Sequence, residues 1–167
     1  MANHIIEPHG GVLVDLLVEK EEVSLLKKES KEWLSWDLQP RQICDLELLI
    51  NGGFSPLTGF MGKRDYESVC LSMRLYEGTI WPIPIILDVT EEFAEKCSSG
   101  KKLVLRDPEG LMLAVMDIDE IWQPEKYAEA NQVFGSDNKE HPGVAYLLNK
   151  TNPVYIGGKI KGVQFPE

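Results

Sequence analysis

The segment TIWPIPIILDV, residues 79–89, restricts the possible folds more than any other part of the chain. It is too apolar for a solvent-exposed loop, yet it contains Pro82 and Pro84. Because residues two apart in a strand direct their N–H groups to the same side, both missing donors would fall on one edge. The segment can therefore pair fully on one side only, and we interpret it as an edge strand or a break in a curved sheet.

Other segments predict short strands and helices in an irregular order. Apolar and β-branched residues predict a strand over 11–18, a hairpin over 101–122 turning at 107–110, and a glycine-broken final strand within 152–163. Amphipathic spacing predicts helices over 19–33, 41–50, 65–73, 90–97, 124–134 and 142–149. Regular βαβ alternation is absent. We therefore predict an α+β fold built on a small, bent, mostly antiparallel sheet or pseudo-barrel.

Two of these helices have a clear predicted inner face. Val23, Leu26 and Trp33 form the apolar stripe of the 19–33 segment. In the 65–73 helix the shared face carries Tyr66, Val69, Cys70 and Met73.

Size and charge limit the class of protein and partner. The chain has 167 residues, the size of one domain, and a net charge of −10 that repels polyphosphate backbones. We therefore expect a single domain, residues 1–167, that binds no nucleic acid. Its three cysteines lack CxxC spacing, which favours reduced thiols over disulfides or a zinc site. Since no apolar run could cross a bilayer and no signal peptide is recognisable, we expect a cytoplasmic protein without membrane contact.

The chain contains no complete P-loop, dinucleotide-binding or nucleophile-elbow motif. The Gly-Lys pairs at 62, 100 and 158 lack both the earlier glycine and the following serine or threonine of a P-loop, and GxGxxG is absent. The stretch Gly53-Phe54-Ser55-Pro56-Leu57 has leucine where the elbow motif GxSxG requires glycine. We predict no catalytic, cofactor-binding or metal-binding residue in this chain.

Histidines and carboxylates give little further support for catalysis. His4 and His9 have a spacing that suits no helical metal pair. His141, just before Pro142, is interpreted first as part of a helix N-terminus and second as a contact to an incoming domain or anion. Acidic groups such as 117–120 are interpreted as solvated faces, although spacing alone leaves a glycosidase-type pair open.

The helix after Pro40 has apolar residues on two sides. Ile43, Leu46, Leu49 and Ile50 form one stripe, whereas the reverse side carries Cys44 and Leu48 beside Arg41 and Asp45, an i,i+4 opposite-charge pair. An ordinary surface helix would be polar there. We predict that this helix is covered on both sides, by its own domain or by another.

The loop GGFSPLTGFM, residues 52–61, carries large apolar residues where polar ones are expected. It either folds back onto its own core or faces a partner domain. Together with the helix and His141, it supplies the candidate inter-domain or loop-scaffolding residues, which are Arg41, Asp45, Leu48, Gly53, Phe54, Ser55, Pro56, Leu57, Gly59, Phe60, Met61 and His141.

Three long motifs carry a resemblance to a known family. They are RQICDLELLINGGFSPLTGFMGKRDYESVCLSMRL (41–75), WPIPIILDV (81–89) and EHPGVAYLLNKTNPVYIGGKIKGV (140–163). Together they resemble the N-terminal domain of ATP sulfurylase (sulfate adenylyltransferase). The resemblance implies a PUA-like pseudo-barrel that precedes an α/β nucleotidyltransferase domain. The implied enzyme uses ATP with magnesium, joins ATP and sulfate into adenosine 5'-phosphosulfate and releases pyrophosphate.

The resemblance also implies that the chemistry lies elsewhere. The family's catalytic motif, Gln-x-Arg-Asn-Pro-x-His, belongs to the following domain, and the nearest fragments here, 39–42 and 152–153, do not fit it. The implied role is structural, with the catalytic domain as partner, a homo-oligomer as an open option and no cofactor in this chain. The alternative is a stand-alone binding or regulatory module derived from such a domain.

Overall fold

The computed structural model describes residues 5–166 and divides them into two compact units. Unit 1 contains the chain up to Gly59, Lys102–Met116 and the residues from Lys159 onward, whereas unit 2 contains Phe60–Lys101 and Asp117–Gly158. Two strands, β5 (Met112–Trp122) and β6 (Val154–Gly162), pass from one unit into the other along the chain. Helices and strands are mixed irregularly, so the predicted α+β class is confirmed.

The strands form a mostly antiparallel sheet with the order β1-β4-β5-β6-β2, and β3 also pairs with β6. The four strands not yet introduced are β1 (Leu34–Asp37), β2 (Gly59–Phe60), β3 (Leu87–Val89) and β4 (Lys102–Arg106). The β1–β4 pair is parallel, and the β3–β6 pair is antiparallel. Among the described residues the strand order starts at β1 and stops at β2, so the sheet is not a closed barrel.

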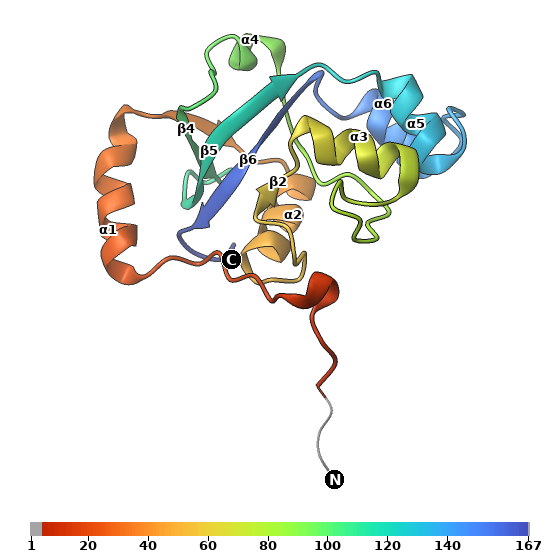
Figure 1. Cartoon of the computed structure of the whole chain (residues 1–167). Helices are drawn as coiled ribbons and strands as arrows, with labels where there is room; N and C mark the ends of the chain where they lie inside the picture. The colour runs from red at the N-terminus through yellow and green to blue at the C-terminus, as the bar shows by residue number, and fades with distance from the viewer. Residues whose placement is uncertain (1–4, 167) are drawn as a thin grey trace. The chain divides into compact units, whose positions relative to one another are not determined.

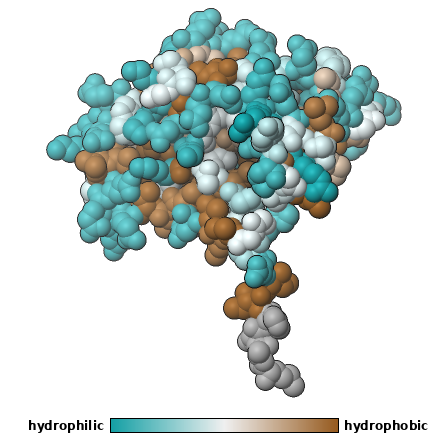
Figure 2. All heavy atoms as spheres, in the orientation of Figure 1, coloured by the Kyte–Doolittle hydropathy of each residue, from teal (hydrophilic) through white to brown (hydrophobic). Residues whose placement is uncertain are grey.

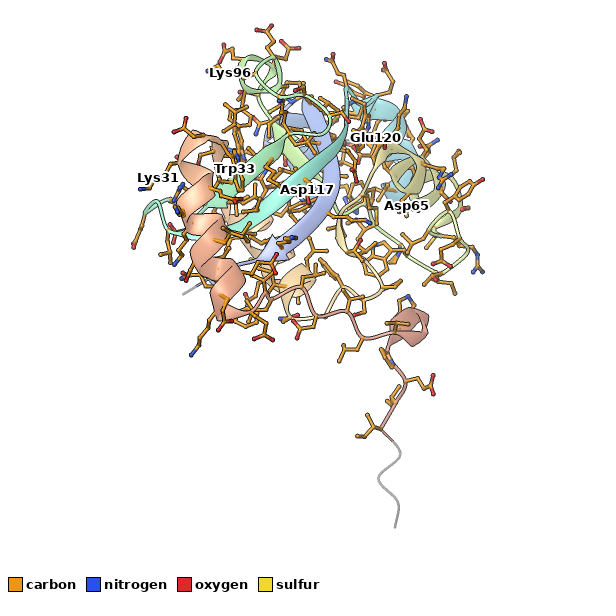
Figure 3. All side chains as sticks on the ribbon, turned by 60° about the vertical axis from the view of Figure 1, so that its left-hand side comes forward. Lys31, Trp33, Asp65, Lys96, Asp117 and Glu120 are labelled. Carbon is orange, nitrogen blue, oxygen red and sulfur yellow. The ribbon has the colours of Figure 1, made fainter. Side chains whose placement is uncertain are left out.

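In unit 1, helix α1 (Lys20–Glu29) covers part of the sheet with the stripe predicted from its spacing. Leu26 is buried in a cluster with Val104, Val115 and neighbouring apolar residues, and Val23 and Trp33 pack against that cluster. Trp33 lies just beyond the helix (Figure 3), and the ammonium of Lys102 lies 5.7 Å from the centre of its ring.

Helix α2 (Pro40–Ile50) also belongs to unit 1 and begins at the predicted proline. Its first turn is fixed by Gln42, whose buried Oε1 accepts the backbone N–H of Gln39 at 3.0 Å and Nε1–H of Trp36 at 3.1 Å. Leu46, Leu49 and Ile50 are completely buried. The predicted inner stripe of this helix is therefore confirmed.

Unit 2 contains four helices, α3 (Lys63–Ser72), α4 (Glu91–Ala94), α5 (Lys126–Phe134) and α6 (Pro142–Asn149), at the predicted places among its described residues. Helix α5 packs against both α3 and α6 (Figure 1). Ala130, Val144 and Leu147 form the buried α5–α6 contact. Thr90 caps α4, as predicted, because its Oγ1 accepts the backbone N–H of Phe93 at 3.2 Å.

Two strand predictions, for 11–18 and for the last strand, need correction, and the 79–89 segment takes the second of its two predicted forms. Residues 11–18 are not a strand, since only Leu17 forms a bridge, to Gly162, and Val12 and Leu13 remain exposed without a pairing neighbour. The 79–89 segment is a strand only at β3, so the stretch around Pro82 and Pro84 is a break. Strand β6 continues through its glycines.

Two further differences concern elements that the sequence pattern missed or misjudged. Strand β1 was not predicted, because its four residues are stabilised by pairing with β4, about 70 residues away in sequence. Met73 was predicted on the buried face of α3, yet its side chain is 54% exposed. The helix has already ended at that point, because Met73 adopts a left-handed conformation with φ of 54°.

Candidate functional site

The predicted ion pair on α2 is present, and one side of this helix is open. Arg41 Nη1 donates to Asp45 Oδ2 at 2.8 Å, with the two side chains 28% and 13% exposed. Cys44 is exposed and Leu48 is 38% exposed. The described part of the chain therefore buries the inner stripe of α2 but leaves the reverse side, where Leu48 lies, for water or a partner.

The loop after α2 is held by a compact set of hydrogen bonds in unit 1. Ser55 is buried, and its hydroxyl donates to the carbonyl of Gly52 at 2.7 Å while accepting the backbone N–H of Val14 at 2.9 Å. Gly53 N–H donates to the side chain of Asn51 at 2.8 Å, and Phe54 N–H donates to the carbonyl of Leu48 at 2.9 Å. This loop has one defined shape rather than a flexible one.

Most of the loop's candidate residues are buried. Leu57, in unit 1, and Phe60 and Met61, in unit 2, are 7%, 3% and 2% exposed. Gly59 is buried as well, whereas Phe54 and Pro56 are half-buried and Gly53 is exposed. The peptide bond between Ser55 and Pro56 is cis. The apolar residues at the end of the loop thus pack, while the start of the loop stays accessible.

His141 occupies the N-terminus of α6, as its first interpretation expected. Its Nδ1 accepts the backbone N–H of Gly143 at 3.1 Å, and its ring lies 5.0 Å from that of Phe134. With Nδ1 engaged as a cap, the imidazole has a structural task within unit 2. Its edge is exposed to solvent.

The sequence did not reveal a cavity of about 350 Å³ in unit 2. Helices α3 and α5 and the end of β5 line it, through residues that include Tyr66, Cys70, Trp122 and Glu129. Glu129 is 5% exposed, and its Oε2 accepts the hydroxyl hydrogen of Tyr155 at 2.8 Å. Tyr66 and Tyr155 meet edge to face with ring centres 5.6 Å apart. A buried carboxylate on a helix of mixed polar and apolar residues has no signature in a single sequence.

The thiol and the two phenols around this cavity are poor nucleophiles. Burial, reinforced by the charge of Glu129, raises the pKa of Cys70 to about 12. The same two causes raise the pKa of Tyr66 and of Tyr155. Burial lowers the pKa of Lys126, whose ammonium bonds to both oxygens of Thr151. At neutral pH the thiol and both phenols stay protonated, so none of these three groups is an activated nucleophile.

Within residues 5–166 no group of three or more histidine, cysteine, aspartate or glutamate side chains could hold a metal ion. No helix in that same range is long and apolar enough to span a bilayer.

Hydrophobic side chains are also exposed, which Figure 2 shows as brown areas between the hydrophilic ones. In unit 1 they lie mainly in the segment before α1, such as Val12 and Leu13. In unit 2 they gather at the end of α3 and in the turn that follows it, namely Leu71, Met73, Tyr76, Ile80 and Ile83. Soluble domains seldom expose so many large apolar residues in one short segment without a use for them.

Comparisons with known proteins give a consistent result. The family model of the PUA-like domain matches residues 6–165. The sulfate adenylyltransferases of Eremothecium gossypii and Saccharomyces cerevisiae are 43% and 42% identical to this chain over 163 residues. Those matches cover 97% and 96% of this chain but only 32% of each relative, so the chain spans about a third of their length.

A solved structure described as a hexameric APS kinase from Thiobacillus denitrificans is similar in fold. It aligns with a TM-score of 0.75 and 31% sequence identity. The alignment covers 98% of this chain and 28% of that one. The fold of the present chain is therefore found again as one part of a larger protein.

Proposed function

This chain belongs to the PUA-like domain family, and from that premise we propose that it is the non-catalytic N-terminal domain of a cytoplasmic sulfate adenylyltransferase. The parent enzyme would convert ATP and sulfate into adenosine 5'-phosphosulfate and pyrophosphate in sulfate assimilation. The observation that carries the proposal is the extent of the similarity, which runs along nearly the whole chain but over about a third of each relative.

The use of the cationic residues supports a non-catalytic role. Transfer of a nucleotidyl group to sulfate needs arginine, histidine and backbone donors gathered where negative charge develops. Here Arg41 is paired with Asp45, Arg106 bonds to the hydroxyl of Ser35, and His141 caps α6. These groups serve local structure. ATP, magnesium and the catalytic motif would belong to the partner domain of this nucleotidyltransferase.

The contribution of this chain would be a surface that holds the catalytic domain. We assign Arg41, Asp45 and Leu48 to such a contact, because α2 keeps a charged pair and an apolar side chain on its open side. The loop from Gly53 to Met61 would act as its scaffold, because its hydrogen bonds and buried residues fix the end of α2. A rigid support of this kind costs little ordering entropy when a partner docks.

The second candidate function is a stand-alone binding module, and the cavity beside Glu129 is the observation that favours it. Its volume of about 350 Å³ falls at the lower end of small-molecule sites. Calorimetric titration of the chain with sulfate, ATP and adenosine 5'-phosphosulfate separates the two functions. Absence of heat supports the non-catalytic domain, whereas saturable micromolar binding supports the module.

The coding sequence gives an independent test of the parent function. We expect the reading frame to continue beyond codon 167 and to encode Gln-x-Arg-Asn-Pro-x-His within the next hundred codons or so. A frame that stops, or that continues without this motif, would overturn the assignment to a sulfate adenylyltransferase and leave the binding module as the better account.

A further inference from the structure

A second candidate contact lies in unit 2, in a segment whose apolar residues the sequence pattern did not single out as exposed. Leu71, Met73, Tyr76, Ile80 and Ile83 are 74%, 54%, 63%, 55% and 46% exposed. We call the exposed part of this segment, which carries these five side chains, the 71–83 surface. All of them come from the end of α3 and the turn after it, so they are close in sequence and belong to one unit.

Hydrogen bonds fix the backbone beneath the 71–83 surface. The N–H of Trp81 donates to the carbonyl of Met73, and the N–H of Leu75 donates to the carbonyl of Thr79, both at 2.8 Å. Arg74 and Ile80 form an antiparallel bridge between these two bonds. The side chains of Leu75 and Trp81 are buried and anchor the turn from inside. The exposed residues are therefore presented by an ordered hairpin-like turn.

A carboxylate on α3 fixes the tip of the same turn. Asp65 Oδ1 accepts the backbone N–H of Tyr76 at 2.9 Å, and Asp65 is labelled in Figure 3. Helix α3 is itself held at its first residue, where the N–H of Lys63 donates to Oε2 of Glu120 at 2.7 Å. The turn is thus bonded to the first turn of α3, which is itself bonded to β5 within unit 2.

Met73 has a backbone conformation that is unfavourable for a residue with a side chain. It is the one non-glycine residue with positive φ among residues 5–166. Glycine is the usual residue at a left-handed helix end, because a side chain is strained there. The chain keeps a methionine at this position and leaves it more than half exposed. A strained and exposed methionine is a candidate contact residue.

The polar groups in the 71–83 surface also suit a protein contact. The guanidinium of Arg64 lies over the ring of Tyr76, 4.2 Å from its centre, and Arg74 Nη1 bonds to the carbonyl of Gly78 at 3.0 Å. Arginine, tyrosine and methionine are enriched at the centres of protein interfaces. Arginines held in fixed orientations can donate their remaining N–H groups to carboxylates or carbonyls of a partner.

We propose that the 71–83 surface docks against the remaining part of the same polypeptide. The face of that part which contacts it would be apolar and would carry hydrogen-bond acceptors for Arg64 and Arg74. This inference rests on the proposed function, since the relatives are about three times longer than this chain and provide such a part. A second copy of the chain is the less suitable occupant, because two chains with a net charge of −10 repel each other.

Methionine oxidation measures this contact directly. In dilute hydrogen peroxide, we expect the isolated chain to oxidise at Met73. The buried methionines should react slowly, and their slow reaction shows that the chain is folded. They are Met61, Met112 and Met116, with exposed fractions of 2%, 5% and 0%. In the full-length protein we expect Met73 to oxidise at least about fivefold more slowly than in the isolated chain. Mass spectrometry of the peptides gives the four rates.

Matched variants of the full-length protein identify the surface. Ile80→Ser should return the oxidation rate of Met73 toward that of the isolated chain, because it weakens the docked face. Tyr127→Ser, at a residue 60% exposed on α5 outside the 71–83 surface, should leave the rate unchanged. Met61 and Met112 must still oxidise slowly in both variants. Their slow oxidation shows that each variant is folded, so a faster rate at Met73 then reports loss of docking.

Two results would overturn the docking proposal by itself. In one, the full-length protein forms adenosine 5'-phosphosulfate but oxidises Met73 as fast as the isolated chain does. In the other, Met73 in the isolated chain becomes protected as the chain concentration rises, which assigns the surface to a second copy. A reading frame that ends at codon 167, or a full-length protein without activity, would instead overturn the proposed function, and the docking proposal with it.

Discussion

The hydroxyl of Tyr155 on β6 donates a 2.8 Å hydrogen bond to Oε2 of Glu129 on α5, and both side chains are buried. Charge-assisted hydrogen bonds of this kind are strong, and a buried carboxylate that loses one is costly. Tyr155 also contacts the rings of Tyr66 and Trp122 at 5.6 and 5.9 Å. The pair therefore connects the helical part of unit 2 to a strand.

Removing the hydroxyl of Tyr155 tests this connection. We expect Tyr155→Phe to lower the free energy of unfolding by about 1–3 kcal/mol, because the carboxylate loses a donor while the ring packing is kept. Tyr127→Phe, at an exposed position on the same helix as Glu129, should change it by less than about 0.5 kcal/mol. Urea denaturation of both variants measures the difference, and equal effects would show that the bond contributes nothing.

Alkaline pH should destabilise the protein through its buried thiol. Burial raises the pKa of Cys70 from 9.0 in the unfolded chain to about 12. Above pH 9 the unfolded chain therefore loses a proton that the folded chain retains, so the free energy of unfolding falls as pH rises toward 12. Each such group contributes a slope of up to about 1.4 kcal/mol per pH unit.

Denaturation series at pH values from about 8 to about 10 measure that slope. Cys70→Ala should reduce the fall in stability between pH 9 and 10, whatever its effect on stability at neutral pH. Cys44→Ala, at an exposed cysteine, should leave the fall unchanged. The account of Cys70 fails if both variants lose stability with the same slope as the unsubstituted chain.

The loop after α2 depends on a glycine at position 52. Gly52 has φ of +83°, and a Cβ built there would lie 2.6 Å from the carbonyl oxygen of Val14. Gly52→Ala should therefore cost the left-handed strain of about 1–2 kcal/mol and an additional steric term. Gly100→Ala has nearly the same φ, +82°, but open space around the added carbon, so it measures the strain alone.

Thermal and urea denaturation of these two variants give the comparison. We expect Gly52→Ala to be the less stable of the two by a margin outside experimental error. If Gly100→Ala is equally destabilised, then the contact between the loop and the segment before α1 does not constrain position 52.

Helices were predictable from the sequence where a nearby residue typical of helix starts, such as proline or threonine, marked the first turn, in α2 together with a stripe of apolar residues. Leu46, Leu49 and Ile50 gave the register of α2, and Pro40 gave its start. Thr90 gave the start of α4 in the same way. These features depend on residues within a few positions of each other, so the local sequence is sufficient to predict them.

Elements that depend on distant partners were not predictable. Strand β1 exists because Leu34 pairs with Leu103. Before α1, by contrast, only Leu17 forms a bridge among residues 11–18. The cavity beside Glu129 arises from three elements that meet only in the folded chain. Met73 looked like a core residue because the pattern continued past the point where the backbone left the helix.

Pyrophosphate release from ATP and sulfate distinguishes a supporting domain from a catalytic one, with molybdate as an alternative acceptor and matched molar amounts of two proteins. We expect the full-length protein to release pyrophosphate in the presence of magnesium, while the 167-residue chain stays at the level of a buffer blank even at high concentration. Turnover by the 167-residue chain above that blank would contradict the claim that this domain supports the catalytic domain without performing the chemistry.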